Sequence, residues 1–600
     1  MVDLHRLKEL YMSGNQLTGN LSGWLEQMTD LIILDLRSNL FNGSMPSSSV
    51  GKFSNLTELY LGGNSLGGVI SDVHFENLTR LQVLDLSYNP ITISIGQSWV
   101  PPFQLRLVYL TNCQLGPQFP EWLQFQTQIE ELYLANCKIA GTMPAWFGNI
   151  SSSTITDLFL SNNQIGGKLP SSLNFTKLET LSLRSNRFEG PLPTMLPSTL
   201  DTLYLSNNSL TGQLPIWPHV RFVSISDNML DGGLSSSICR WTGGLVYLDL
   251  SNNKLLGQIP YYCLGKSLQN LYFLNLGNNH ISGEIPHTIG FLSELRLLQL
   301  KNNSFSGEVP LSLKNCTKLQ FLDLAQNNLV GSIMLWMGEN LRQLIVLRLR
   351  SNMFSGVISW QLARFEQLQI LDLANNNFSG SIPHNIGNLN TMRSTSQYYD
   401  FCYDELDVFT KGQDLYYLQC NMQLMKSLDL SNNCLTGEIP KGVGDLAGLK
   451  NFNLSRNHLQ GEIPWAIGGM ISLESLDLSI NNPLSLSILH SLNYLNLSYN
   501  NLSGMIPSGN QLQTFIDPSI YMGNANLCGP PISKSCFNNK TTYIIPEHKK
   551  EIPRWLWFYI SIVLGYVMGF WTFCGILFLK DAWRHAYFHM IDDIYDRFWV

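Results

Sequence analysis

The sequence has 600 residues, of which 14% are charged, and its formal net charge is −7 at pH 7. This balance argues against a nucleic-acid partner, because proteins that bind nucleic acids usually present a basic stripe. The 11 histidines are scattered along the chain. No Ser/His/Asp set, metal-ligand cluster or carboxylate pair stands out, so we expect neither an enzyme nor a metal or cofactor site.

One motif, L-x-x-L-x-L-x-x-N, recurs through most of the chain, as in LRLLQLKNNSFSGEVP from Leu295 to Pro310. Its mean period of about 24 residues lies inside the range of leucine-rich repeats. Sixteen copies precede residue 390 and four follow it, and two of them carry cysteine in place of asparagine. This slot is filled by Asn15, Asn39, Asn64, Asn89, Cys113, Cys137, Asn163, Asn186, Asn208, Asn228, Asn253, Asn279, Asn303, Asn327, Asn352, Asn376, Asn433, Asn457, Asn481 and Asn500.

Each slot of the motif has a physical reason. The two leucines of L-x-L point to one side of a short strand, and stacked repeats bury them jointly. The asparagine amide can pair with backbone groups that would otherwise be buried and unpaired. Because cysteine is a small buried hydrophobe with a weak donor, we interpret Cys113 and Cys137 as members of this ladder rather than as a disulfide. The ending L-x-G-x-I-P, as in Leu435–Pro440, predicts a bend at glycine and no pairing beyond proline.

The predicted fold is an α/β-type solenoid, a curved stack of leucine-rich repeats with a parallel β-sheet on its concave face. The G-x-I-P ending is similar to the plant-specific class of repeat. We expect about 16 repeats over residues 1–390, a non-repeat insertion over 391–424, and about four repeats over 425–508. One of these four is degenerate, because 481–500 has lost the G-x-I-P ending.

Aromatic residues fill one outward position between the strand leucines in the first half of the chain, with acidic neighbours at Glu58, Glu131 and Asp157. Such a column on a concave face could bind a protein or peptide ligand. The alternative is that aromatic residues simply suit exposed strand positions. The predicted ligand-binding aromatics are Tyr60, Tyr109, Tyr133, Phe159 and Tyr204.

A second candidate site is the sequence Arg348-Leu349-Arg350, whose alternation places both guanidiniums on one outward face. Two arginines can clamp a carboxylate or a sulfate. The pair is similar to the R-x-R pair of plant peptide-hormone receptors, which implies a site for a peptide C-terminus. The alternative is a pair of solvated arginines with Glu366 or Asp372 nearby.

Fourteen N-x-S/T sequons favour a secreted or extracellular route for the repeats. Two of them, at Asn453 and Asn496, fall on predicted strands, where the rhythm of the repeat produces the pattern by accident. Others lie off the strands, where a glycan is tolerated. The predicted glycosylation sites are Asn42, Asn55, Asn77, Asn174 and Asn315.

The insertion at 391–424 is rich in tyrosine and aspartate and has no leucine period. Its segment VFTKGQDLYY, residues 408–417, is strand-like. A disulfide between Cys402 and Cys420 could hold the excursion together, although connectivity does not follow from sequence. Long insertions of this kind are often functional, and the alternative is a tolerated surface loop.

Residues 509–554 are predicted to cap the solenoid and lead to the membrane, since a terminal coil would otherwise expose its leucines. Cys528 and Cys536 are placed to form a capping disulfide, and Cys239 and Cys263 lie about one repeat apart and could also bridge.

Residues 555–579 contain no charge and are long enough to cross a membrane with some tilt. Gly565 and Gly569 form a G-x-x-x-G pattern that would let a partner helix approach closely. The alternatives are a buried core helix and glycines without a contact role. The sequons orient the repeats outside and the tail, 580–600, inside. That tail is too short for a kinase, so we expect signalling to need a partner.

These parts together resemble plant leucine-rich receptor-like proteins. The resemblance is carried by the plant-type repeats, the insertion FTKGQDLYY, the four repeats after it, NANLCGPP, the single span and the tail WRHAYFHMIDDIYDRF. The tail and the juxtamembrane stretch most resemble the subgroup of fungal-xylanase elicitor receptors and Cf-type resistance proteins. The resemblance implies a single-pass plasma-membrane receptor of plant defence, with its ectodomain outside. It would lack a kinase, recognise a microbial elicitor and work with adaptor receptor kinases.

Two departures from this family pattern are visible. The chain starts within a repeat, without a signal segment or an N-terminal cap, so we expect an N-terminally truncated copy. Three other functions stay open: a developmental receptor for a secreted peptide hormone, a soluble inhibitor of microbial wall-degrading enzymes, and a copy without function. A soluble inhibitor has no use for a spanning segment.

Overall fold

The structure, a computed structural model, describes residues 6–536 except for 22–27, 46–51, 150–151, 235–237, 242–243, 263, 266–267, 333, 396–405, 411–412, 418–424, 484–491 and 507–513. All described residues belong to one compact unit, Met1–Cys536. Among them, no helix combines the length and the apolar character that crossing a membrane requires. The span predicted for 555–579, with Gly565 and Gly569, and the tail lie outside the described residues.

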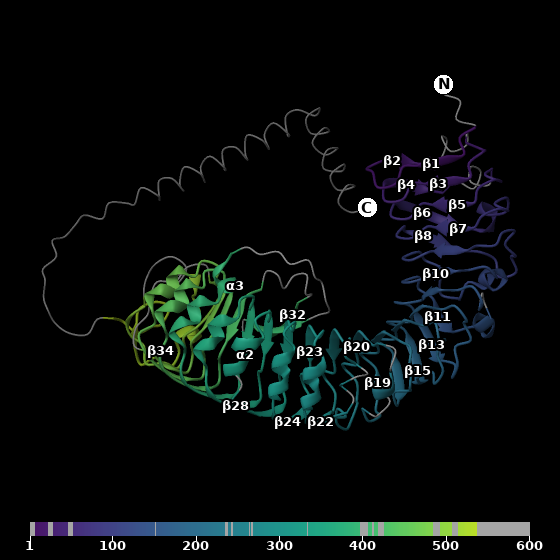
Figure 1. Cartoon of the computed structure of the whole chain (residues 1–600). Helices are drawn as coiled ribbons and strands as arrows, with labels where there is room; N and C mark the ends of the chain where they lie inside the picture. Colours follow the sequence, from purple (N-terminus) through teal and green to yellow (C-terminus); the bar gives the residue numbers. More distant parts are fainter. Residues whose placement is uncertain are drawn as a thin grey trace, which may run out of the picture. The chain divides into compact units, whose positions relative to one another are not determined.

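A single parallel ribbon of twenty strands runs through the described residues, one strand for each predicted repeat (Figure 1). Each strand pairs in register with that of the next coil, so the prediction of stacked repeats is confirmed. The strands are β1 (Glu9–Tyr11), β3 (Ile33–Asp35), β5 (Glu58–Tyr60), β7 (Val83–Asp85), β9 (Leu107–Tyr109), β10 (Glu131–Tyr133), β12 (Asp157–Phe159), β14 (Thr180–Ser182), β16 (Thr202–Tyr204), β18 (Phe222–Ser224), β20 (Tyr247–Asp249), β21 (Phe273–Asn275), β23 (Leu297–Gln299), β25 (Phe321–Asp323), β27 (Val346–Arg348), β29 (Ile370–Asp372), β33 (Ser427–Asp429), β35 (Asn451–Asn453), β37 (Ser475–Asp477) and β39 (Tyr494–Asn496).

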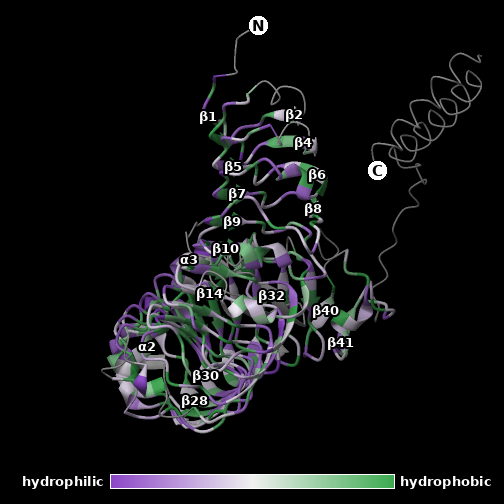
Figure 2. Ribbon diagram, turned by 90° about the vertical axis from the view of Figure 1, so that its right-hand side faces the viewer, coloured by the Kyte–Doolittle hydropathy of each residue, from purple (hydrophilic) through white to green (hydrophobic). Residues whose placement is uncertain are grey.

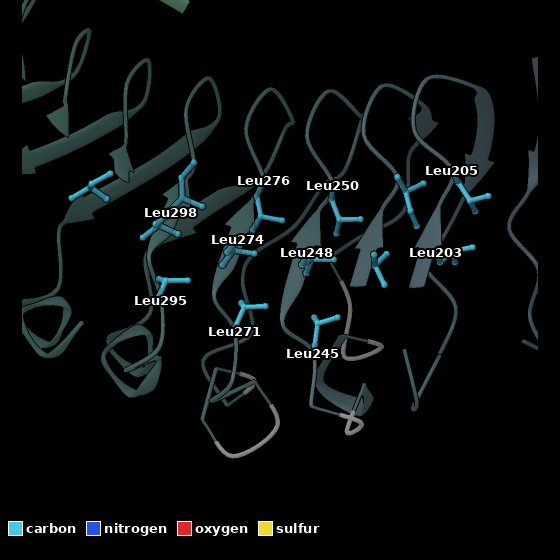
Figure 3. Close-up of a cluster of buried hydrophobic side chains, with 14 of the residues drawn as sticks. Leu203, Leu205, Leu245, Leu248, Leu250, Leu271, Leu274, Leu276, Leu295 and Leu298 are labelled. Atoms are coloured by element: carbon cyan, nitrogen blue, oxygen red, sulfur yellow. The ribbon is translucent and has the colours of Figure 1, made fainter. Parts of the chain in front are cut away.

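The motif leucines form the core, as Figure 3 shows for the region between Leu203 and Leu298. Leu271, Leu274 and Leu276 of one coil lie beside Leu295 and Leu298 of the next, and all five are buried. Because a coil has no interior of its own, each leucine is buried mainly by its neighbours above and below.

The asparagine of each repeat pairs with the backbone of two coils. The Asn303 side-chain amide donates to the carbonyl oxygens of Leu276 and Leu300 at 2.9 and 3.2 Å, and its Oδ1 accepts from the amide of Ile281 at 3.0 Å. In the cysteine variants, the thiols of Cys113 and Cys137 donate to the carbonyls of Leu86 and Leu110. Both cysteines are unbridged and buried, which confirms their interpretation as ladder members.

Besides the predicted bend, the L-x-G-x-I-P ending forms further short strands on the side of the coil away from the ribbon (Figure 2), and β24 ends before the proline of its motif. These strands pair in parallel as the leucine strands do, and β30 pairs with β34 even across the insertion. Gly307, at φ 77°, supplies the left-handed turn that such a strand needs. The strands are β2 (Thr18–Asn20), β4 (Leu40–Ser44), β6 (Ser65–Ile70), β8 (Ile91–Ile93), β11 (Ala140–Thr142), β13 (Gln164–Lys168), β15 (Arg187–Pro191), β17 (Ser209–Gly212), β19 (Met229–Leu230), β22 (Ser282–Glu284), β24 (Ser304–Glu308), β26 (Asn328–Gly331), β28 (Met353–Val357), β30 (Asn377–Ser381), β34 (Cys434–Glu438), β36 (His458–Gly461) and β38 (Asn482–Pro483).

Short helices complete most coils, and many begin directly after the proline of the motif. That proline has a fixed φ that suits the residue before a helix. The 3₁₀ helices are η2 (Asp72–His74), η3 (Glu121–Phe125), η4 (Ala145–Asn149), η5 (Ile238–Arg240), η6 (His287–Phe291), η7 (Leu311–Asn315), η8 (Trp360–Arg364), η9 (His384–Asn388), η10 (Lys441–Asp445), η11 (Trp465–Gly469) and η13 (Pro518–Tyr521), and the α-helices are α2 (Met334–Asn340) and α3 (Asn390–Arg393).

The insertion leaves the ribbon unbroken, because β29 pairs directly with β33 across it. Within it, β31 (Leu406–Thr410) and β32 (Gln413–Tyr417) form an antiparallel hairpin, which confirms the strand-like character predicted for 408–417. Cys402 and Cys420 lie outside the described residues.

The C-terminal end of the solenoid is closed by β40 (Ser503–Met505), β41 (Asn526–Cys528) and η13. Asn524 extends the asparagine ladder by one step, donating to Leu497 O and accepting from Leu502 N. Cys528 and Cys536 form the predicted disulfide. Cys239 is also disulfide-bonded, and Cys263 lies outside the described residues.

Candidate ligand-binding surface

The outward positions of the ribbon differ in burial between its two halves. In β5, β9, β10, β12 and β16 the central residue is buried and the two flanking residues are half-buried. Among strands of this half, β7 departs from the pattern with three buried residues. From β21 to β35, all three residues of every ribbon strand are buried. Apart from β39 at the C-terminal end, which has two half-buried residues, the open part of the concave face therefore lies between β1 and β16, and we call it the open half.

An apolar cluster accounts for much of the buried half. Its members occupy the first, outward-facing residue of successive strands and are separate from the leucine core. Met425, which directly follows the insertion, joins them. The cluster contains Phe273, Leu297, Phe321, Val346, Ile370 and Met425.

Three of the five predicted aromatics form a stack on the open half. The ring centroids of Tyr109 and Tyr133 are 5.0 Å apart, and those of Tyr133 and Phe159 are 4.5 Å apart and nearly parallel. Register explains the stack, since these residues lie opposite one another on β9, β10 and β12. The other two predicted aromatics are not part of it: Asp85 separates Tyr60 from the stack, and Ser182 separates Tyr204 from it.

Acidic side chains flank these rings. The Tyr109 hydroxyl donates to Glu131 Oε2 at 2.6 Å, and the Tyr60 hydroxyl donates to Glu58 Oε2 at 3.1 Å. Asp157 lies opposite Glu131 on the neighbouring strand. The open half of the ribbon therefore carries an aromatic column beside an acidic one.

Burial and the neighbouring carboxylates raise the pKa of these phenols. Burial, and then the hydrogen bond to Glu58, raises the pKa of Tyr60 to about 12. Burial, and then the charges of Asp157 and Glu131, raises the pKa of Tyr133 to about 12. The pKa of Tyr109 is raised by burial and by Glu131. All three phenols therefore stay neutral donors at physiological pH, and among the described residues no cluster of acidic, cysteine or histidine side chains is suited to a metal ion.

Known proteins match the chain over most of its length. The Leucine rich repeat family matches residues 54–115. The chain is 38% identical to Receptor-like protein EIX2 of Solanum lycopersicum over 557 residues, an alignment that covers 88% of this chain and 52% of that protein. It is 31% identical to the ectodomain of the Arabidopsis receptor kinase HAESA in complex with an IDA peptide hormone, with a TM-score of 0.70 over 89% of this chain and 88% of that one. Single repeats match at 6–28, 128–150, 154–175, 177–198, 199–220, 244–265, 270–292, 294–316, 367–389, 425–446, 448–470 and 491–512.

The chain belongs to the leucine-rich-repeat receptor-like proteins. It spans about half of the length of EIX2. A second solved relative, HAESA in complex with IDA and the co-receptor SERK1, is 27% identical with a TM-score of 0.62 and covers 88% of this chain.

The arginine pair of this receptor-like protein is neither solvated nor open to a ligand. Arg348 and Arg350 are only 3% and 9% exposed. Arg348 pairs with Asp323 at 2.9 Å, and Arg350 pairs with Asp372 at 2.7 Å and with Asp429 at 2.5 Å. We call these five residues the charge cluster. The pair is thus held by carboxylates of the same chain.

The cluster joins the two sides of the insertion, because Asp372 and Asp429 lie on β29 and β33. Burial raises the pKa of Asp429 to about 6, with the Asp372 charge acting in the same direction and Arg350 against it. The nearby carboxylates raise the pKa of Arg350 although burial opposes them.

Four of the five predicted glycosylation sites of the receptor-like protein are exposed. Asn42, Asn77, Asn174 and Asn315 are exposed, and Asn55 is half-buried. Asn453 is buried and donates to Asp429 at 3.4 Å, in keeping with an accidental sequon.

Sequence reasoning missed Arg37, which lies at the N-terminal end of the open half. Its guanidinium makes two hydrogen bonds to Asp35, at 3.1 and 2.8 Å, and its Cζ lies 4.2 Å from the centroid of the Tyr60 ring. The signal was present in the sequence LDLRS, because alternation places residues two apart on one face.

Proposed function

We propose that the chain is part of a cell-surface receptor of plant defence that binds a microbial elicitor, a protein or a peptide, on the open half of its concave ribbon. The observation that carries the proposal is the aromatic and acidic surface of β9, β10 and β12, on a chain 38% identical to EIX2 over 88% of its length. Aromatic side chains are enriched at the energetically important centres of protein interfaces.

The buried half of the ribbon fits a different role. Its outward residues are buried, and the first residues of successive strands pack against one another, so this half exposes little side-chain surface to a ligand. The open half requires no such rearrangement, and pre-organised surfaces bind with a smaller conformational penalty.

In this proposal the receptor is anchored in the plasma membrane by residues 555–579, with the repeats outside and 580–600 inside. Gly565 and Gly569 would contact the spanning helix of an adaptor receptor kinase, which supplies the signal. The co-receptor SERK1 in complex with HAESA is a precedent for a co-receptor partner. If replacing both glycines by leucine leaves co-precipitation with the adaptor unchanged, this contact is wrong.

The proposal is tested by pull-down of the full chain, delivered to the secretory pathway by an added signal sequence, with labelled fungal elicitors. We expect capture by the unmodified chain and its loss in Tyr133→Ala. The matched control, Tyr262→Ala, removes an exposed tyrosine outside the ribbon and should keep full capture. Equal capture by both variants would contradict the assignment to the open half.

A developmental peptide-hormone receptor is the second candidate, and the likeness to HAESA bound to IDA favours it. Labelled peptide hormones in the same pull-down separate the two functions. The occupied state of Arg348 and Arg350 argues against a peptide C-terminus held there, since Asp323, Asp372 and Asp429 already neutralise both guanidiniums.

A further inference from the structure

The stack of Tyr109, Tyr133 and Phe159 runs beside the carboxylates of Glu131 and Asp157. Each acid and its aromatic neighbour are two residues apart on one strand, so they lie about 6–7 Å apart on the same face. In-register pairing of β10 and β12 repeats this arrangement in the next coil. We call these five residues the acid–aromatic patch.

Within the described residues, the patch has no basic partner. Glu131 accepts from Tyr109 and Asp157 accepts from Thr156, and no ion pair involves either carboxylate. Arg106, the basic residue at this part of the ribbon, pairs with Glu130 instead, at 3.6 Å. The charged groups that act on Tyr133 are Asp157 and Glu131, both negative. The patch is therefore an acidic surface whose counter-charge the described chain does not supply.

The same chain shows which group such a surface accepts. At the N-terminal end of the ribbon, the Arg37 guanidinium lies over the Tyr60 ring and pairs with Asp35 through two nitrogens. Asp35 and Tyr60 lie opposite each other on adjacent strands. An aromatic face and a carboxylate on neighbouring strands of this ribbon thus hold one guanidinium. The patch offers both groups, with its acids at the first and its aromatics at the third strand position.

We propose that the acid–aromatic patch binds an arginine side chain of the ligand, with the guanidinium stacked on the Phe159 ring at the end of the stack and hydrogen-bonded to Glu131 and Asp157. This inference rests on the proposed function and adds the chemical class of the ligand: a protein or peptide segment that is basic and carries arginine. Arginine fits better than lysine, because its planar guanidinium can stack on a ring and donate two parallel hydrogen bonds at once.

The test uses the full chain in detergent and labelled peptides of glycine, serine and one further residue type, two of which form the main comparison. That residue is arginine in one peptide and citrulline, its neutral analogue, in the other. We expect the arginine peptide to bind about 10-fold or more tightly than the citrulline peptide, and a lysine peptide to fall between them; a tenfold ratio corresponds to about 1.4 kcal/mol. Equal binding of the arginine and citrulline peptides to the unmodified chain, or no binding of either peptide, overturns the inference before any variant is made.

Two double variants locate the binding site. Glu131→Gln with Asp157→Asn should abolish the preference for arginine. Glu294→Gln with Glu339→Gln removes the same charge from surface ion pairs with Lys318 and Arg364, and should retain it. If both double variants lose the preference equally, net charge and not the patch is responsible, and the inference fails.

The test of the arginine site and the test of the proposed function can fail independently of each other. Capture of a fungal elicitor that survives Glu131→Gln with Asp157→Asn would overturn the arginine site and leave the receptor function intact. An arginine preference located at the patch, on a chain that captures no elicitor, would support the site and contradict the elicitor function.

Discussion

Replacing Asp429 by asparagine should flatten the pH dependence of the receptor's stability. Asp429 is fully buried in the charge cluster, where Arg350 donates to it and the Ser431 amide caps it at 3.0 Å. Asparagine keeps the size of the side chain and one acceptor oxygen but cannot ionise. Any pH dependence that Asp429 contributes is therefore absent from the variant.

The magnitude follows from the raised pKa of Asp429, which is about 6 in the folded chain against 3.8 for the ordinary carboxyl. Because the folded pKa is the higher one, the contribution is fully present below pH 3.8 and is lost as the pH rises through about 6. A shift of this size corresponds to about 3 kcal/mol between those limits. Relative to Asp429→Asn, the unmodified chain should thus lose stability between pH 4.5 and pH 7.5.

Thermal melting of both chains across this pH range measures the effect as a difference in midpoint. Other aspartates with raised pKa values, such as the buried Asp85 and the half-buried Asp477, act equally in both chains and cancel. Asp445→Asn, which removes an exposed carboxylate on η10, controls for the change in net charge. Parallel curves for the unmodified chain and Asp429→Asn would refute the buried position assigned to this carboxylate.

Two further predictions concern the coil itself. Leu274→Ala should lower the free energy of unfolding by about 2–5 kcal/mol, because neighbouring coils cannot collapse into the space, and an unchanged melting midpoint would contradict the shared core. Ile480 is 40% exposed at φ 55°, a conformation that β-branched residues adopt with strain. Ile480→Asn should therefore raise the free energy of unfolding by about 1 kcal/mol, and a lower midpoint than that of the unmodified chain would count against this strain.

The ribbon could be predicted from sequence because the residues that determine it lie within a single repeat. The spacing of leucines fixes which side chains share a face, and the asparagine slot fixes where each coil turns. The twenty asparagine or cysteine positions of the motif correspond to the twenty strands of the ribbon. The strands around Gly307 were not predicted, because they arise from pairing between the endings of neighbouring coils. That pairing persists even across the insertion, where β30 pairs with β34.

The candidate site was predictable only in part. Register brings Tyr109, Tyr133 and Phe159 together, and register follows from the repeat alignment. Burial from β21 to β35 was not predicted, although part of it arises where the first residues of successive strands, one repeat apart, pack against one another. The partners of the arginine pair could be predicted only in part. Asp323 and Asp372 occupy the same repeat position as Arg348. Asp429 is brought to the pair only because the ribbon continues across the insertion.

A glycan placed on the open face tests the central claim most directly. Phe159→Asn creates the sequon Asn-Leu-Ser at 159–161, within the acid–aromatic patch, and Phe291→Asn creates the same sequon at 291–293, on η6 away from the ribbon. Phe291 is 61% exposed, so a glycan there meets no packed core. With each glycan confirmed by glycosidase shift, elicitor capture by the full chain should be lost in Phe159→Asn and retained in Phe291→Asn. Full capture by the glycosylated Phe159→Asn chain would contradict ligand binding on the open half of the ribbon.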